Sequence, residues 1–233
     1  NTRFNTERGE FEVYNGSQWE KGDEYPIDIP SNCEFWWDAA SPQSYPGSGS
    51  VWYDLSGNGR NGSLSNVPYS KIAGGSFAYN GSTSRASVAI PNITSAHTVI
   101  VWARSDYRST GNVSSTDRRT VFKSSGDWNP GLWMTNGMIR PHATTQYRDT
   151  YWNKQYLDYD WHMFGQIHDG TNVWLIFDGW IIRQTDAQFA YNPGQETTLY
   201  IGSEADSTSH CWLGDISFAS CFSRALSEGL LHS

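Results

Sequence analysis

Cysteine is scarce in this chain, and its three copies follow no metal-binding spacing. A small scaffold stapled by disulfides uses many more cysteines, and a structural zinc site needs closely paired ones. The sequence therefore indicates neither kind of protein. Cys211 and Cys221 leave two alternatives, a disulfide or two buried free thiols, and the free thiols are the favoured interpretation.

Basic clusters and long apolar runs are missing as well. The formal net charge is −8, and Arg118-Arg119 is the densest basic pair. Nucleic acids and anionic membranes bind to a clustered basic face, so we expect neither as a partner. No stretch approaches the roughly 18 apolar residues of a membrane span, so we expect no membrane insertion. Because the sequence begins with Asn1 rather than methionine, we expect a further N-terminal region.

Aromatic and turn-forming residues are abundant. The chain has 12 Trp, 13 Tyr and 10 Phe but only 17% charged residues, a balance that suits broad aromatic sheet faces. Residues 36–64 alternate short aromatic runs with Gly, Asn, Ser and Pro. Gly57 and Gly59 can adopt positive φ, and Asp54 can accept backbone N–H bonds from the turn that follows it. This stretch predicts strands joined by tight turns.

Many short strands with regular turns and no helical periodicity predict an all-β fold, a two-sheet antiparallel β-sandwich. Asp178-Gly179 between apolar runs predicts a hairpin turn, and 169–172 predicts another. One helical turn is expected from Leu226 to Leu231. The predicted strands are 34–39, 51–54, 60–64, 76–79, 85–90, 97–103, 119–123, 131–134, 137–140, 161–168, 172–178, 180–185, 197–202 and 211–219.

The first twenty residues form a module of their own. Two short alternating strands surround a turn at 7–9, and an Asn15-Gly16 turn leads into Trp19. A lone hairpin is marginal in water, so it must pack on the following domain or on other copies of itself. We therefore divide the chain into a hairpin attachment segment (1–20), an extended linker (21–32) and a large β domain (33–233).

An ordered series of motifs runs from about Phe35 to the C-terminus. These motifs are Asp38-Ala39-Ala40, 44–49, 52–64, 75–82, 97–103, 161–164, Phe177-Asp178-Gly179, 199–202, 213–218 and 223–227. In this order they resemble laminin-G-like, concanavalin-A-like jelly-roll domains, in the variant that recurs in structural proteins of tailed bacteriophages. Residues 2–19 separately resemble a hairpin unit of phage fibre and baseplate proteins.

Together the two resemblances imply a non-catalytic virion surface protein. They imply a tail fibre, head fibre or capsid decoration protein that faces the exterior and contacts host-surface glycans or other virion proteins. Since fibre proteins are commonly trimeric, they also imply a homo-oligomer. A free-standing carbohydrate-binding lectin module is the alternative, and a glycan hydrolase ranks behind it.

A polar segment rich in aromatic residues, 104–160, holds the candidate ligand-binding residues. Aromatic rings stack on the C–H faces of sugars, while Arg, Asp and Asn bond to hydroxyls. Stapling of a long loop, or a subunit interface, is the favoured competing interpretation, since Tyr, Trp and Arg are also enriched at interfaces. The candidates are Asp127, Trp128, Asn129, Tyr147, Arg148, Tyr151 and Trp152.

Catalytic patterns are weak. Glycanases with this fold place two carboxylates on one strand face. Asp158 and Asp160 come nearest, but a position just before Trp161 suits a solvated turn. No serine stands in a Gly-x-Ser-x-Gly elbow, and no Gly-rich segment opens a helix. We expect no enzymatic activity and no required cofactor.

Calcium is suggested only by the resemblance, because laminin-G-like relatives often carry Ca²⁺ on loop oxygens. Asp54, Asn58 and Asp215 are the positions that would hold it. Turn capping is the stronger interpretation of Asp54. Ser217 also stands where many relatives have an acid, which argues against a shared metal site.

Overall fold

The computed structural model describes residues 2–5, 10–14, 17–21, 29, 32–90, 96–106, 118–125, 131–135, 138–141, 159–184, 198–204 and 210–227. The chain divides into two compact units, Asn1–Ser31 and Asn32–Ser233. Within the described residues no helix is long and apolar enough to cross a membrane. The finer division into a hairpin of 1–20 and a linker of 21–32 stays a prediction.

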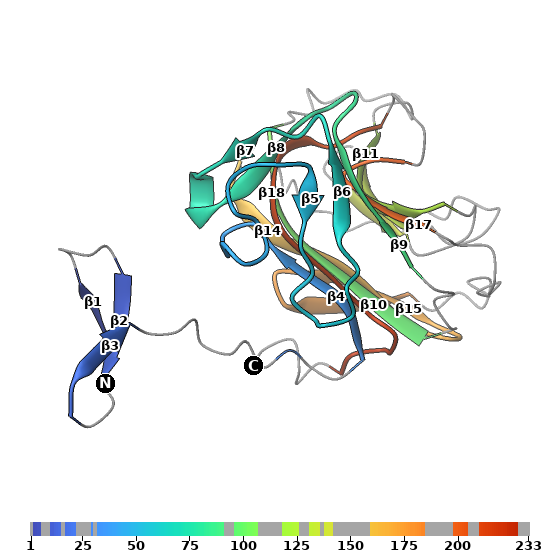
Figure 1. Cartoon of the computed structure of the whole chain (residues 1–233). Helices are drawn as coiled ribbons and strands as arrows, with labels where there is room; N and C mark the ends of the chain where they lie inside the picture. The colour runs from blue at the N-terminus through green and yellow to red at the C-terminus, as the bar shows by residue number, and fades with distance from the viewer. Residues whose placement is uncertain are drawn as a thin grey trace. The chain divides into compact units, whose positions relative to one another are not determined.

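The first unit contains a three-stranded antiparallel sheet (Figure 1). Its strands are β1 (Thr2–Asn5), β2 (Glu10–Tyr14) and β3 (Trp19–Lys21), in that order across the sheet. The alternating pattern predicted the first two strands. The third was expected only as a turn into Trp19, and its pairing with Tyr14 extends the hairpin by one strand.

The second unit is a β-sandwich of two antiparallel sheets, which confirms the predicted fold class (Figure 1). One sheet has eight strands, in the order β16-β15-β14-β10-β18-β8-β7, with β4 also paired to β18. Its strands are β4 (Cys33–Asp38), β7 (Tyr69–Ser70), β8 (Ser76–Asn80), β10 (Ala96–Ser105), β14 (Trp161–Asp169), β15 (Val173–Phe177), β16 (Trp180–Gln184) and β18 (Leu213–Phe222).

The other sheet has seven strands, in the order β13-β12-β11-β17-β9-β6-β5. They are β5 (Val51–Trp52), β6 (Gly62–Ser65), β9 (Arg85–Ala89), β11 (Arg118–Ser124), β12 (Gly131–Thr135), β13 (Met138–Pro141) and β17 (Thr198–Ile201). A 3-10 turn, η1 (Ile72–Gly74), follows β7. Each strand predicted after residue 32 is present. The two-residue strand β7 and the extension of β18 to Phe222 were missed, and the expected helical turn lies outside the described residues after Ser227.

Aromatic side chains fill the space between the sheets. The Phe35 ring stacks on Trp37 at 4.3 Å, Trp37 lies 5.2 Å from Trp52, and Trp52 meets Phe77 edge-on at 4.8 Å. All four are fully buried, and burial of each stabilises the fold by about 2–3 kcal/mol. Part of the chain's aromatic content is therefore explained by the core.

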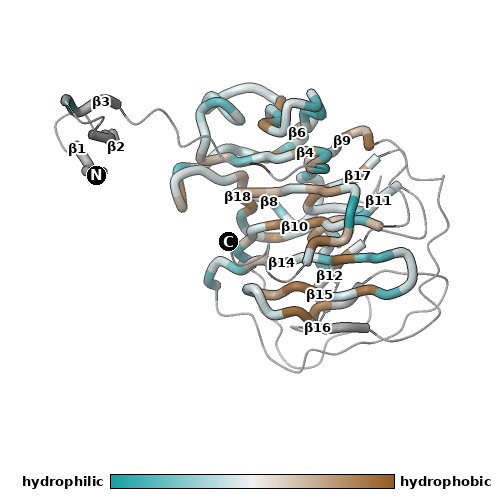
Figure 2. The backbone as a smooth tube through the Cα atoms, turned by 90° about the horizontal axis from the view of Figure 1, so that it is seen from below, coloured by the Kyte–Doolittle hydropathy of each residue, from teal (hydrophilic) through white to brown (hydrophobic). Residues whose placement is uncertain are grey.

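Strand alternation separates core from surface. On β10, Val101 and Ala103 belong to the core, whereas Trp102 between them is exposed. The buried Gln166 on β14 accepts a 3.0 Å bond from Gly131 N, which links the two sheets. Figure 2 shows the central strands from β18 to β16 side by side, with hydrophobic stretches along them.

Candidate functional site

The predicted sugar-binding cluster lies outside the described residues. Its seven members, Asp127, Trp128, Asn129, Tyr147, Arg148, Tyr151 and Trp152, fall between 125 and 131 or between 141 and 159. The described part of the chain therefore shows neither whether these side chains lie close together nor whether they hold a long loop in place. The cluster stays a prediction.

Asp54 serves the loop that it opens. Its Oδ1 accepts bonds of 2.9 Å from Trp36 N and Ser56 N, and its Oδ2 accepts from Ser56 Oγ at 2.8 Å and Arg60 N at 3.0 Å. Both carboxylate oxygens are therefore engaged by donors of the protein itself. This confirms the turn-capping interpretation of Asp54.

The other two calcium candidates are engaged elsewhere. Asn58 Nδ2 donates to the Cys33 carbonyl at 2.7 Å. Asp215 is buried and pairs with Arg104, whose Nη2 lies 2.5 Å from Asp215 Oδ2. Among the described residues no group of three or more His, Cys, Asp or Glu side chains could hold a metal ion.

The three cysteines are buried free thiols, as the favoured interpretation had it. Burial, with the nearby charges of Asp54 and Glu34, raises the pKa of Cys33 to about 12. Burial also raises the pKa values of Cys211 and Cys221. Neutral thiols are poor nucleophiles and poor metal ligands, so the cysteines serve packing.

Of the weak catalytic pair, Asp160 is exposed in a bend before β14, and Asp158 lies outside the described residues. Tyr159 between them has a φ of 67°, which is a turn conformation. The Asp160 carboxylate is thus placed in solvent rather than in the sandwich core.

The most exposed large apolar side chain in the described part of the chain is Trp180, at 72%. It begins the edge strand β16 directly after the Asp178-Gly179 turn, whose φ values of 47° and 80° confirm the predicted tight hairpin. Trp180 pairs across the hairpin with Phe177, which is buried. A rigid turn therefore presents an indole ring to solvent.

Polar groups next to Trp180 are held in place by β14. Asp178 Oδ1 accepts a 2.8 Å bond from Met163 N, and Asp178 Oδ2 lies 2.7 Å from His162 Nδ1. The His162 ring also stacks on Phe177 at 4.8 Å. Because a carboxylate only accepts, Nδ1 of His162 carries the proton in this pair.

We call Trp180, Asp178 and His162 the hairpin-tip site. The sequence predicted its turn but not its function, because Trp180 stands outside the polar loop that attracted attention. An indole immediately after an Asp-Gly turn was the available signal. Chemically, the site offers one aromatic face for stacking and a partly exposed carboxylate, Asp178, which the imidazole of His162 holds in place.

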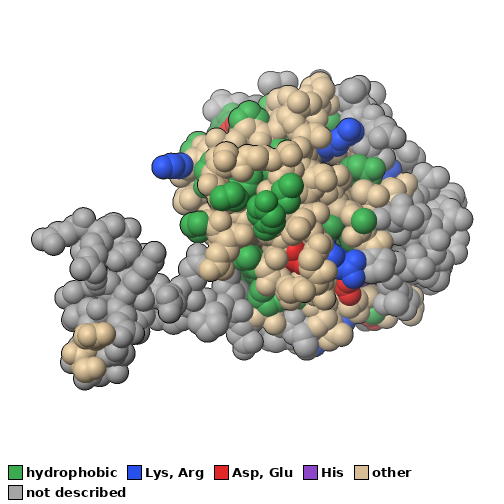
Figure 3. All heavy atoms as spheres, in the orientation of Figure 1, with side chains coloured by type: hydrophobic (Ala, Val, Ile, Leu, Met, Phe, Trp, Pro, Cys, Tyr) green, Lys and Arg blue, Asp and Glu red, His purple; other side chains and the backbone are tan. Residues whose placement is uncertain are grey.

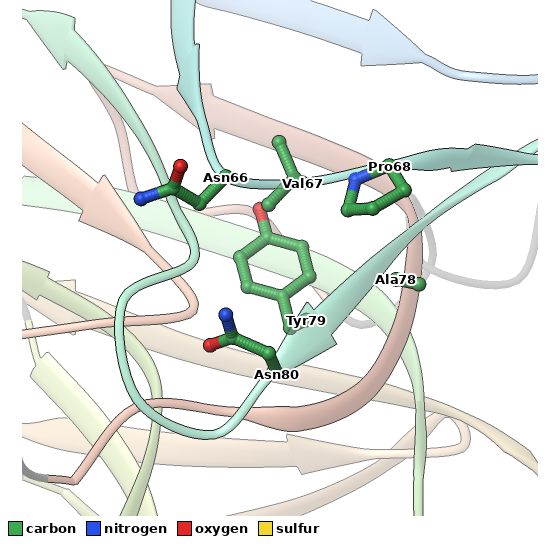
Figure 4. Close-up of a pocket in the computed structure, with 6 residues that line it drawn as sticks. All are labelled: Asn66, Val67, Pro68, Ala78, Tyr79 and Asn80. Atoms are coloured by element: carbon green, nitrogen blue, oxygen red, sulfur yellow. The ribbon is translucent and has the colours of Figure 1, made fainter.

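A second feature is an open hollow of about 530 Å³ near the opposite edge of the eight-stranded sheet (Figure 4). Its walls are mostly apolar, with two asparagines at the rim. The lining residues are Asn66, Val67, Pro68, Ala78, Tyr79 and Asn80.

No protein-family model and no curated protein matches this chain. Solved structures do match. Domain 4 of an extracellular arabinanase from Geobacillus stearothermophilus, in complex with arabinotriose, is 14% identical with a TM-score of 0.59, over 86% of this chain and 96% of that one.

Two longer proteins have TM-scores of 0.63–0.64. Trypanosoma rangeli sialidase in complex with sialic acid has a TM-score of 0.64 at 12% identity, over 88% of this chain and 32% of that chain. The receptor-binding domain of botulinum neurotoxin type G has a TM-score of 0.63 at 14% identity, over 86% of this chain and 50% of that chain. This chain thus spans a third to a half of their lengths, and at such identities the likeness establishes the β-sandwich fold alone.

Proposed function

We propose that this chain is a non-catalytic module that binds sugars through the hairpin-tip site. The proposal rests mainly on the position of Trp180, which is 72% exposed directly after a tight turn whose Asp178 is hydrogen-bonded to His162. A tight turn limits the backbone freedom that is lost on binding, and the face of the exposed indole suits the C–H face of a sugar ring. Asp178, whose side chain is 36% exposed, has further lone pairs that can accept bonds from hydroxyls, and His162 holds it in place.

The structural neighbours support this proposal. The arabinanase domain was solved with arabinotriose and the sialidase with sialic acid, and the neurotoxin domain binds a receptor. Sugars are thus bound in two of these three similar structures. The same kind of ligand is the natural first test for this chain.

A glycan array followed by calorimetry tests the proposal. We expect Trp180→Ala to weaken binding of the best glycan at least about tenfold, because the stacking surface is lost. Tyr53→Ala is the matched control, since Tyr53 is also exposed (43%) but lies next to β5, in the other sheet. An equal loss of glycan affinity in both variants, or no loss of affinity in Trp180→Ala, contradicts the proposed binding site.

We further propose that binding needs no metal ion. Both oxygens of Asp54 accept bonds from the protein, and Asp215 pairs with Arg104. Calorimetry in EDTA should therefore give an unchanged affinity. A loss that calcium restores would contradict this.

The place we propose for the module is the exterior of a tailed-phage virion, as a fibre or decoration protein that forms a homo-oligomer. The motif series and the N-terminal hairpin pattern carry this proposal. Contacts with other virion proteins have a candidate surface, because hydrophobic side chains gather on one face over β5 and β7 (Figure 3). Tyr53 and Ile72 are exposed there at 43% and 46%. A cryo-EM map of the native particle in which this chain cannot be traced on the exterior would contradict the proposal.

A further inference from the structure

The hollow between residues 66–68, which precede β7, and the end of β8 is lined by a residue with a buried polar atom that lacks a partner among the described residues. Tyr79 lines the hollow, and its Oη is buried with no hydrogen-bond partner among the described residues. Buried hydroxyls in native proteins are nearly always bonded to protein, water or ligand, because leaving them unpaired costs free energy. We therefore expect this hydroxyl to form a hydrogen bond with a group from outside the described residues.

The Tyr79 ring is held in one position. A side chain at Gly202 would come within 2.2 Å of the ring, so the ring lies against the Gly202 backbone. Burial raises the pKa of Tyr79, which keeps its hydroxyl protonated as a donor. Figure 4 shows the ring rising from β8 among the lining side chains, with the hydroxyl next to Val67.

The rim on both sides is fixed by hydrogen bonds. Asn80 Oδ1 accepts from Ser82 N, Thr83 N and Ser84 N at 2.8–3.2 Å. Ser84 Oγ in turn donates to the Asn66 carbonyl. Ala78 N donates to the Pro68 carbonyl at 2.9 Å. The rim of the hollow is therefore fixed before any ligand arrives, which lowers the cost of binding, and only the Val67 side chain has to move to expose the Tyr79 hydroxyl.

The lining favours a ligand group that is part apolar and part polar. Val67, Pro68 and Ala78 offer methyl and ring surfaces, while Asn66 and Asn80 add side-chain amides at the rim. Among the described residues no hydrogen bond engages the side-chain amide of Asn66, which is exposed at the rim.

We propose that this hollow binds the acetamido group of an N-acetylated sugar. Its carbonyl accepts the proton of the Tyr79 hydroxyl once Val67 rotates, its methyl packs against Val67 and Pro68, and its N–H donates to the amide oxygen of Asn66. A volume of about 530 Å³ admits this group with part of the ring that carries it. The site is separate from the hairpin tip, because β7 and β16 are at opposite ends of the eight-stranded sheet.

Saturation-transfer NMR on the full chain tests the proposal with two probes that differ only at C2. They are methyl N-acetyl-β-glucosaminide and methyl β-glucoside. We expect the acetamido methyl to show the strongest saturation and the N-acetyl sugar to bind at least about fivefold more tightly. Tyr79→Phe should lower its affinity about five- to tenfold. Trp180→Ala should leave the acetamido signal unchanged, so the two sites can fail independently.

Thermal unfolding supplies the second readout. Since the Tyr79 hydroxyl has no hydrogen-bond partner among the described residues, Tyr79→Phe should keep or raise the melting temperature. Tyr45→Phe is the control, because Tyr45 Oη donates to the Gly49 carbonyl at 2.9 Å and its loss should lower that temperature. Equal affinity for the two sugars, an affinity for the N-acetyl sugar that is unchanged in Tyr79→Phe, or a melting temperature lowered as in Tyr45→Phe overturns the proposal.

Discussion

Single aspartates at the ends of strands hold loops and turns of this molecule in place through hydrogen bonds. Asp54 accepts four hydrogen bonds and joins β4 to the loop before β6. Asp169 accepts from Thr171 N and Asn172 N at 2.8 and 2.6 Å in the predicted turn between β14 and β15. The turn-capping bonds of these residues could be predicted from the sequence because they are local, whereas the bond from Trp36 N to Asp54 could not.

We expect Asp54→Ala to lower the free energy of unfolding by about 2–4 kcal/mol, because several donors lose their acceptor together. Urea unfolding followed by circular dichroism measures this. Asp38→Ala is the control, since its carboxylate accepts one local bond, from Ala40 N, and should cost less than about 1 kcal/mol. Similar losses of unfolding free energy in the two variants would show that the four hydrogen bonds of Asp54 stabilise the fold no more than the single bond of Asp38.

The buried thiols predict a pH response. The folded pKa of Cys33, about 12, is raised above its ordinary value of 9.0, so the fold favours the protonated thiol. The contribution of this thiol to the free energy of unfolding is fully present below pH 9 and is lost as the pH rises from 9 towards 12. We expect Cys33→Ala to show a smaller loss of stability over that range than the native chain does.

Alkylation measures the same property directly. At pH 8, iodoacetamide should leave the native chain unmodified and label all three cysteines after denaturation, as judged by mass spectrometry. Rapid labelling of Cys33 in the native protein would contradict its burial.

At the scale of strands and turns, the period-two pattern and the Asp-Gly turns were enough to predict the sandwich. They failed where structure depends on distant partners. β7 has only two residues, and it forms because Tyr69 and Ser70 pair with Phe77 and Ser76 of β8. A two-residue strand has no alternation to detect.

The hairpin-tip site was missed for a related reason. His162 and Asp178 are sixteen residues apart, and the pairing of β14 with β15 brings them together. Trp180 is exposed because β16 is an edge strand, and no local pattern reveals which strand lies at an edge. The Arg104–Asp215 pair, joined across β10 and β18, was likewise beyond sequence reasoning.

Strand β6 allows a test of packing between the sheets. A Cβ at Gly62 would lie 2.7 Å from the Trp37 ring, which is fully buried. Gly62→Ala should therefore lower the free energy of unfolding by about 1–3 kcal/mol through overpacking. Ser63→Ala, an exposed neighbour on the same strand, should change it by less than about 0.5 kcal/mol. A neutral Gly62→Ala would mean that Trp37 can move aside.

At the scale of the whole molecule, the proposed attachment segment predicts self-association. The sheet of β1, β2 and β3 has only the minimum number of strands for independent stability. We expect light scattering to give the full chain a multiple of its 26.2 kDa mass, and a chain of residues 32–233 a single copy. A monomeric full chain that still binds glycan favours the free-standing lectin alternative.

The central claim is that this sandwich works by contact at Trp180 and leaves its glycan intact. Affinity electrophoresis in gels that contain the polysaccharide found to bind, with reducing ends assayed in the same gel, tests it most directly. The account predicts a retarded native chain, an unretarded Trp180→Ala variant and no new reducing ends. Reducing ends that accumulate with the native chain and fall in Asp158→Ala or Asp160→Ala, or retardation that survives Trp180→Ala, would contradict it.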